Sequence, residues 1–153
     1  MTSTTTRNLV LIGFVLVTAL AATTGAKFMP GTWYASLAKP SWTPPNWLFG
    51  PVWTVLYIMI AVAGWLVWRE AGWSAPLVFW GAQLILNTAW SVIMFGAHKI
   101  GWALADLVLL WLAIVGFIVT AWPISSTAAL LFVPYLAWAS FAGALNFAVW
   151  RLN

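Results

Sequence analysis

The chain has 153 residues, of which 64% are hydrophobic and 5% are charged, and its formal net charge is +4. A soluble domain carries charge on about 25% of its residues, so this composition excludes a water-soluble globular protein and leaves the lipid bilayer as the solvent. The six lysine and arginine residues are scattered along the chain, which excludes the clustered basic face that binds nucleic acid. Cysteine is absent, so disulfides and thiolate metal sites are excluded.

Several apolar stretches are long enough to cross a bilayer, which takes about 20 residues of helix. The first, residues 9–26, follows Arg7 and contains no charge. It also fits a signal peptide with small residues at Ala21 and Ala22, but the membranous sequence that follows favours a first spanning helix. The other spans are predicted at residues 50–68, 75–97, 101–122 and 127–150.

Prolines mark the ends of these spans. Pro51 opens the second span and Pro76 lies in the first turn of the third, where a missing N–H removes no helical hydrogen bond. Pro134 lies inside the fifth span, where it predicts a kink near Leu130. The sequence therefore predicts an all-α membrane protein, with residues 1–153 forming a single domain that is one bundle of five transmembrane helices.

A long loop, residues 27–47, is dense in proline, tryptophan and lysine. Because five spans place the termini on opposite sides, the positive-inside rule predicts that this loop and the C-terminus lie inside and the N-terminus outside. The short ends, poor in acidic residues, favour a bacterial cell membrane. The basic residues divide into Arg7 and Arg69 on one side and Lys27, Lys39, Lys99 and Arg151 on the other.

Some spans carry amides and aromatic rings on one face. Gln83, Asn87 and Trp90 are spaced four and three residues apart, so they share one face of the third helix. An amide in hydrocarbon is costly unless it is bonded, so this face must look into the bundle or a cavity. Interhelical hydrogen bonding and the lining of a ligand pocket remain open as alternatives. Comparable faces on the second and fifth helices consist of Trp53, Tyr57, Tyr135, Trp138, Ala142 and Asn146.

The 14 tryptophans fall into two groups. Those near span ends fit interfacial aromatic belts, whereas Trp53, Trp90 and Trp138 lie deeper or beside polar residues. An indole offers a flat face and one N–H donor, so several of them facing inward would suit a flat, apolar, partly polar ligand. The tryptophans near span ends include Trp47, Trp68, Trp73, Trp102, Trp122 and Trp150.

Asp106 is the only carboxylate well within a span. Acid–base chemistry normally needs a second titratable partner, so a structural pairing with His98 or Lys99 is favoured over a proton relay. A lone histidine beside a lysine at a helix end is more often interfacial than a metal ligand, and the sequence contains no metal-binding or haem-attachment motif.

A tryptophan- and proline-rich run, residues 39–47, is followed by Gly50-Pro51-Val52-Trp53 and later by Pro134-Tyr135-Leu136-Ala137-Trp138 and Leu145-Asn146-Phe147. This series of motifs, in order between Trp33 and Arg151, resembles the tryptophan-rich sensory protein and translocator protein family (TspO/MBR, once called peripheral benzodiazepine receptors). The resemblance implies a bundle of five transmembrane helices, often dimeric. It also implies binding of porphyrins such as protoporphyrin IX and haem, and of sterols and synthetic benzodiazepine-type ligands.

In that family the pocket opens toward the first long loop, which acts as its lid. The cholesterol-recognition pattern of animal members needs a tyrosine where this chain has Phe147, between Leu145 and Arg151, which makes sterol binding doubtful. The ligand-lining positions carried over from the resemblance are Tyr34, Trp42, Trp53, Tyr57, Asn87, Trp90, Trp138, Ala142 and Asn146.

The leading hypothesis is a membrane receptor or carrier for tetrapyrroles, acting in their transport, sensing or disposal. Porphyrin or haem is then a ligand, and no cofactor is required. The expected partners are the bilayer, the porphyrin-type molecule and, as an option, a second copy of the chain, but not nucleic acid. One alternative is porphyrin breakdown that depends on light and oxygen, although no acid–base pair or metal motif supports an enzyme. The other is a structural or regulatory membrane subunit without a ligand.

Overall fold

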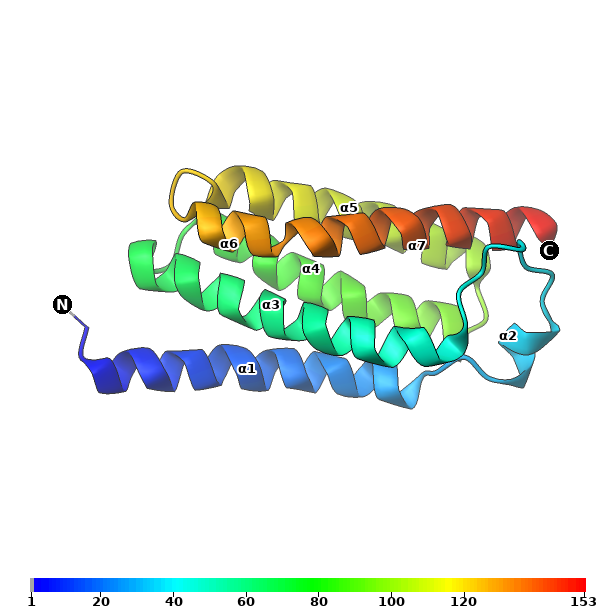
Figure 1. The fold of residues 1–153 in the computed structure, drawn as a ribbon, viewed down its shortest axis with the longest axis horizontal. Helices are drawn as coiled ribbons and strands as arrows, with labels where there is room; N and C mark the ends of the chain where they lie inside the picture. The colour runs from blue at the N-terminus through cyan, green and yellow to red at the C-terminus, as the bar shows by residue number, and fades with distance from the viewer. Residues whose placement is uncertain (1) are drawn as a thin grey trace.

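The computed structural model describes residues 2–153, which form helices and connecting loops without strands (Figure 1). Five helical segments are long and apolar enough to cross a membrane, so the predicted all-α bundle of five transmembrane helices is confirmed. In chain order the elements are α1 (Thr4–Lys27), α2 (Thr32–Ser36), η1 (Asn46–Leu48), α3 (Phe49–Ala71), α4 (Ala75–Ser91), η2 (Val92–Gly96), α5 (Ile100–Ala121), α6 (Ser126–Leu131) and α7 (Val133–Leu152).

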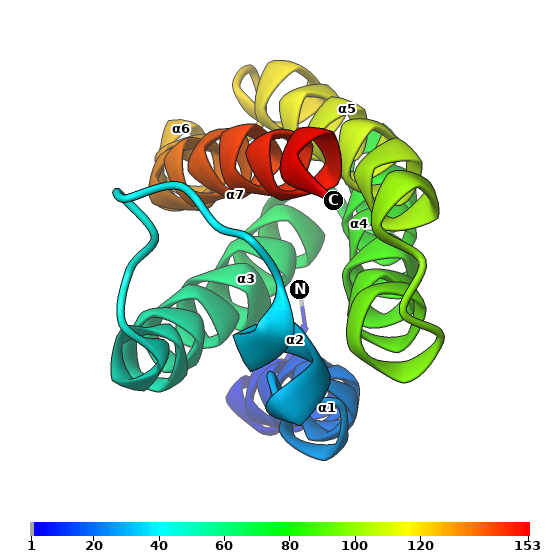
Figure 2. The same cartoon turned by 90° about the vertical axis from the view of Figure 1, so that its right-hand side faces the viewer.

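The helices form a ring when the bundle is viewed along its axis (Figure 2). α1 packs against α3 and α4, α4 packs along α5, α5 packs along α7, and α6 closes the ring against α3. Aromatic and β-branched side chains fill its centre, as a close-packed interior requires. The largest fully buried ones include Ile60, Ile114, Phe117, Phe132 and Tyr135.

The outer surface of the bundle is apolar, as lipid requires. α1 shows this most clearly, because its only buried side chains are Phe14, Thr18 and Ala21. Leu16 and Leu20 point outward with 63% and 72% of their surface exposed. In water such a surface would aggregate, whereas a bilayer solvates it.

The fifth span is interrupted at Phe132, where α6 ends and α7 begins. Pro134 lacks the N–H that would continue the α6 ladder, which explains the break. The predicted kink is therefore present, although it lies two residues later than Leu130.

The third span ends at Gly96, one residue before the predicted end at Ala97. Its last turn is a π-helix, η2, in which the Ala97 N–H donates to the Val92 carbonyl at 2.8 Å. His98 follows with a φ of 57°, a left-handed conformation that reverses the chain into α5. π-Helical turns are rare and often occur near functional sites.

Candidate ligand-binding site beneath the long loop

Aromatic rings from α3 and α7 meet inside the bundle around Trp53. The Trp53 ring centroid lies 5.4 Å from Tyr57, 6.2 Å from Tyr135 and 6.5 Å from Trp138. The last two contacts are edge-to-face, a favoured geometry for aromatic pairs. We call Trp53, Tyr57, Tyr135 and Trp138 the central aromatic cluster.

Buried amides of α4 tie this cluster together. The Tyr57 hydroxyl donates to Asn87 Oδ1 at 2.9 Å, and Asn87 Nδ2 donates to the Tyr135 hydroxyl at 2.8 Å. That hydroxyl in turn donates to Gln83 Oε1 at 2.8 Å. Gln83 Nε2 is buried without a partner in residues 2–153. An unsatisfied buried donor costs about 1–3 kcal/mol. An acceptor that enters the site would recover this cost by accepting from the Gln83 amide N–H.

Asn146 anchors a second polar group beside the cluster. Trp90 Nε1 donates to Asn146 Oδ1 at 3.1 Å, and Asn146 Nδ2 donates to the Ile100 carbonyl at 3.0 Å. Ala142, one turn earlier on α7, packs against the main hydrophobic core. The side chains of Asn87 and Asn146 therefore form the interhelical hydrogen bonds that the structural alternative expects.

The long loop covers the end of the bundle at which α3 begins and α7 ends (Figure 2). Within it, Tyr34 on α2 is buried and meets Phe95 edge-on at 5.6 Å. Burial raises the pKa of the Tyr34 phenol above its ordinary value. Lys39 Nζ donates to the carbonyls of Tyr34, Ala35 and Leu37 at 2.7, 3.3 and 3.1 Å, which fixes the end of α2.

Trp42 in the loop is 47% exposed, and its ring is linked to the central aromatic cluster through Phe141. Its ring meets Phe141 at 5.7 Å, and Phe141 meets Trp138 at 5.7 Å. The loop is also fastened to the end of α7, because the Asn153 amide exchanges two hydrogen bonds with the Ala38 backbone, at 2.8 and 3.1 Å. The loop is therefore packed onto the end of the bundle, through Tyr34 on one side and through Ala38 and Trp42 on the other.

An apolar groove of about 590 Å³ runs between α3 and α7. Pocket volumes of this order accommodate small organic ligands. Trp138 belongs both to this groove and to the central aromatic cluster, so it forms the wall between the bilayer side and the bundle interior. The groove is lined by Pro51, Val52, Val55, Leu56, Pro134, Ala137, Trp138 and Phe141.

The structure thus gathers the residues expected from sequence in three places. One group, in contact directly or through Tyr135, consists of Trp53, Tyr57, Asn87 and Trp138. A second group lies beside it and consists of Trp90, Ala142 and Asn146. The remaining two, Tyr34 and Trp42, lie in the long loop. The spacing of Tyr135 and Gln83 predicts inward faces but does not mark them as ligand residues, although they complete the hydrogen-bond network. Phe49 and Phe141, which also contact Trp138, carry no polar pattern that would have indicated them.

Asp106 does not form the predicted pairing. In residues 2–153 the one ion pair joins Arg69 and Glu70 at 3.0 Å, and Asp106 Oδ2 is buried without a hydrogen-bond partner. His98 and Lys99 are exposed at the end of the bundle, whereas Asp106 lies more than one turn into α5 with its side chain buried. The prediction of an ion pair with either residue is wrong.

Comparison with known proteins gives a consistent result over nearly the whole chain. The model of the TspO/MBR family matches residues 9–151. The chain is 45% identical over 147 residues to the protein CrtK of Rhodobacter capsulatus, covering 92% of this chain and 90% of that protein. It is 44% identical over 150 residues to the human translocator protein (93% and 89% covered) and 39% identical over 140 residues to the tryptophan-rich sensory protein of Cereibacter sphaeroides (92% and 89%).

Proposed function

Because this chain belongs to the TspO/MBR family of integral membrane proteins, we propose that it is a membrane receptor or carrier for tetrapyrroles such as protoporphyrin IX and haem. The observation that carries the proposal is the convergence of Trp53, Tyr57 and Trp138 on the α4 amides beneath a lid. In this function the protein takes part in the transport, sensing or disposal of the ligand, and no cofactor is needed.

The chemistry of the site matches a porphyrin in two respects. Indole faces of Trp53 and Trp138 would stack on the flat macrocycle, and stacking of this kind adds about 0.5–1.5 kcal/mol per pair beyond area burial. The open donor of Gln83 and the Asn87 amide would face its polar edge. A ligand must part the existing ring contacts to enter, so binding is coupled to lid opening and to movement of Trp138.

The propionates of the ligand need cationic partners. Lys39 is held by three carbonyls in the closed lid, so it becomes available only when the lid moves. Lys27 is exposed at the end of α1, where its ammonium lies 5.8 Å from the Phe28 ring centroid. Lys27 is the cation that can meet a propionate first.

The test is a ligand comparison on purified protein in detergent. Protoporphyrin IX at 100 times its Kd should stabilise the folded state by about 2.7 kcal/mol, seen as a rise in the thermal unfolding temperature. A sterol should give a smaller rise, because Phe147 stands where the recognition pattern needs a phenol and is half exposed toward lipid. An equal rise with the sterol, or none with the porphyrin, would count against the proposal.

A second candidate function is oxidation of the bound porphyrin by light and oxygen. The observation that favours it is the contact of Trp53 with both Trp138 and Tyr57, since adjoining indole and phenol rings can supply electrons in succession. Illuminating the complex and following new absorption bands separates the two functions. Breakdown that needs Trp53 and Trp138 favours the enzyme, and bleaching at the rate of free porphyrin favours binding alone.

We also infer the orientation from charge. Lys27, Lys39, Lys99 and Arg151 lie at the lid end, which the positive-inside rule places in the cytoplasm of a bacterial cell. The chain has no cysteine, so single cysteines report position cleanly. Thr2→Cys should react with an impermeant maleimide in intact cells, whereas Ser41→Cys, exposed in the lid, should react only after lysis. The reverse pattern would invert the orientation.

A further inference from the structure

The two ends of the bundle differ strongly in charge. The lid end carries Lys27, Lys39, Lys99 and Arg151, and in residues 2–153 no acidic side chain accompanies them, because Asp106 is buried and Glu70 lies at the far end with Arg69. Lys39 is already held by backbone carbonyls. Lys99 and Arg151 are exposed and form no ion pair with any other described residue.

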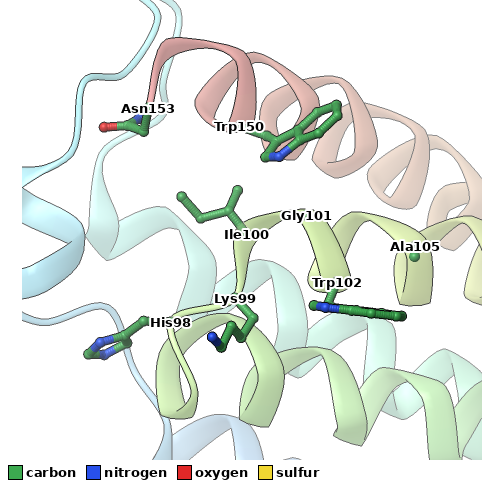
Figure 3. A pocket seen from close by; sticks show the side chains of 8 residues that line it. All are labelled: His98, Lys99, Ile100, Gly101, Trp102, Ala105, Trp150 and Asn153. Carbon is green, nitrogen blue, oxygen red and sulfur yellow. The ribbon is translucent and has the colours of Figure 1, made fainter.

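An open pocket of about 560 Å³ lies at this end between the start of α5 and the end of α7. Figure 3 shows Lys99 and Trp102 on one side of it and Trp150 and Asn153 on the other. Trp102 is 73% exposed and Trp150 is 48% exposed, which is typical of tryptophans at the headgroup level. Gly101 lines the pocket and lets Trp150 pack close against α5, because a Cβ there would lie 3.1 Å from Trp150 Nε1.

We propose that this pocket binds the phosphate headgroup of an anionic phospholipid. Such a headgroup can pair with the Lys99 ammonium and lie between the indoles of Trp102 and Trp150 at the ends of α5 and α7. The positive charge of this end of the bundle also attracts an anionic leaflet. The pocket is distinct from the central aromatic cluster, so the proposal stands independently of porphyrin binding. Two of its residues also hold the lid: Asn153 bonds to Ala38, and the His98 ring stacks on Trp33 at 4.1 Å. A bound lipid would therefore contact the anchors of the lid.

The test uses native mass spectrometry of the full chain in neutral detergent, with phosphatidylglycerol and phosphatidylcholine added in equal amounts. The wild-type chain should retain one phosphatidylglycerol in preference to phosphatidylcholine. Lys99→Gln should lower that preference about fivefold, the value expected for one lysine near an anionic lipid. Lys27→Gln is the matched control, because it removes the same charge from the same end but does not line the pocket.

A second variant removes the space and keeps the charge. Gly101→Leu should displace the lipid, because the larger side chain would crowd Trp150 and enter the pocket that both residues line. A circular dichroism spectrum checks that the variant folds. An equal loss in Lys27→Gln and Lys99→Gln would mean diffuse attraction and overturn the site. The site would also be overturned if Gly101→Leu retained phosphatidylglycerol as fully as the wild-type chain. Displacement of the lipid by millimolar inorganic phosphate alone would overturn the assignment to a lipid headgroup.

Discussion

Replacing Trp53 or Trp138 by phenylalanine is expected to weaken protoporphyrin IX binding about tenfold, which corresponds to ~1.4 kcal/mol. Each substitution keeps an aromatic ring in the core but removes much of the indole face and its N–H. Both indoles belong to the central aromatic cluster, and Trp138 also lines the groove toward the bilayer. The measurement is a titration of the porphyrin absorption band with purified protein, because that signal does not depend on the number of tryptophans.

Trp47→Phe is the matched control for this experiment. Trp47 lies near the lid end of α3 but is 72% exposed, so its loss should leave the affinity unchanged. Thermal unfolding without ligand separates a binding defect from a packing defect. If the Trp53 and Trp138 variants bind porphyrin like the wild type, the ligand does not lie between these rings, and the family resemblance has been mapped onto the wrong residues.

Periodicity was enough to predict the inner faces of the helices. Asn87 and Trp90 on α4, and Tyr135 and Trp138 on α7, are three residues apart. In the structure Asn87 and Tyr135 are buried, and the half-buried Trp90 and Trp138 pack against the core. The reason is energetic: an amide or phenol facing hydrocarbon would lose its hydrogen bonds. The same spacing could not decide whether the amides serve a ligand or one another, since both need an inward face.

The contacts of the long loop could not be predicted in the same way, because they join residues far apart in sequence. The bond between Asn153 and Ala38 and the stacking of Trp33 on His98 have no periodic signal. The π-helical turn η2 also escaped prediction, since π-helices are rare and have no clear composition. Asp106 shows the opposite limit, because nearness in sequence to His98 and Lys99 does not bring its buried carboxylate next to their exposed side chains.

Glycines in the spans also differ in ways that only the packing shows. Gly64 and Gly81 are both small residues on spanning helices, and neither belongs to a G-x-x-x-G pair. In the structure a Cβ at Gly64 would lie 2.6 Å from Trp80 Nε1 and 2.8 Å from the Phe14 ring, whereas a Cβ at Gly81 meets nothing within 4 Å. At Gly64, therefore, side chains from α1 and α4 pack directly against the backbone of α3, whereas Gly81 has no such neighbour.

Gly64→Ala is accordingly expected to destabilise the bundle by about 1–3 kcal/mol, the usual cost of overpacking a close-packed core. Trp80 is buried and donates to the Ile60 carbonyl at 2.8 Å, so moving its indole away from the new methyl group would lengthen or break that bond. In a domain of this size the loss appears as a fall of several degrees in the thermal unfolding temperature.

Gly81→Ala is the control, because it makes the same chemical change inside a helix with no neighbour to meet. Alanine restricts the unfolded backbone more than glycine does, so this variant should be unchanged or slightly more stable, by up to ~1 kcal/mol. The comparison isolates the contact at Gly64 from the general effect of glycine in helices. Equal unfolding temperatures for the two variants would show that α1 can shift outward at little cost, and that the Phe14–Trp80 contact does not fix its position in the ring.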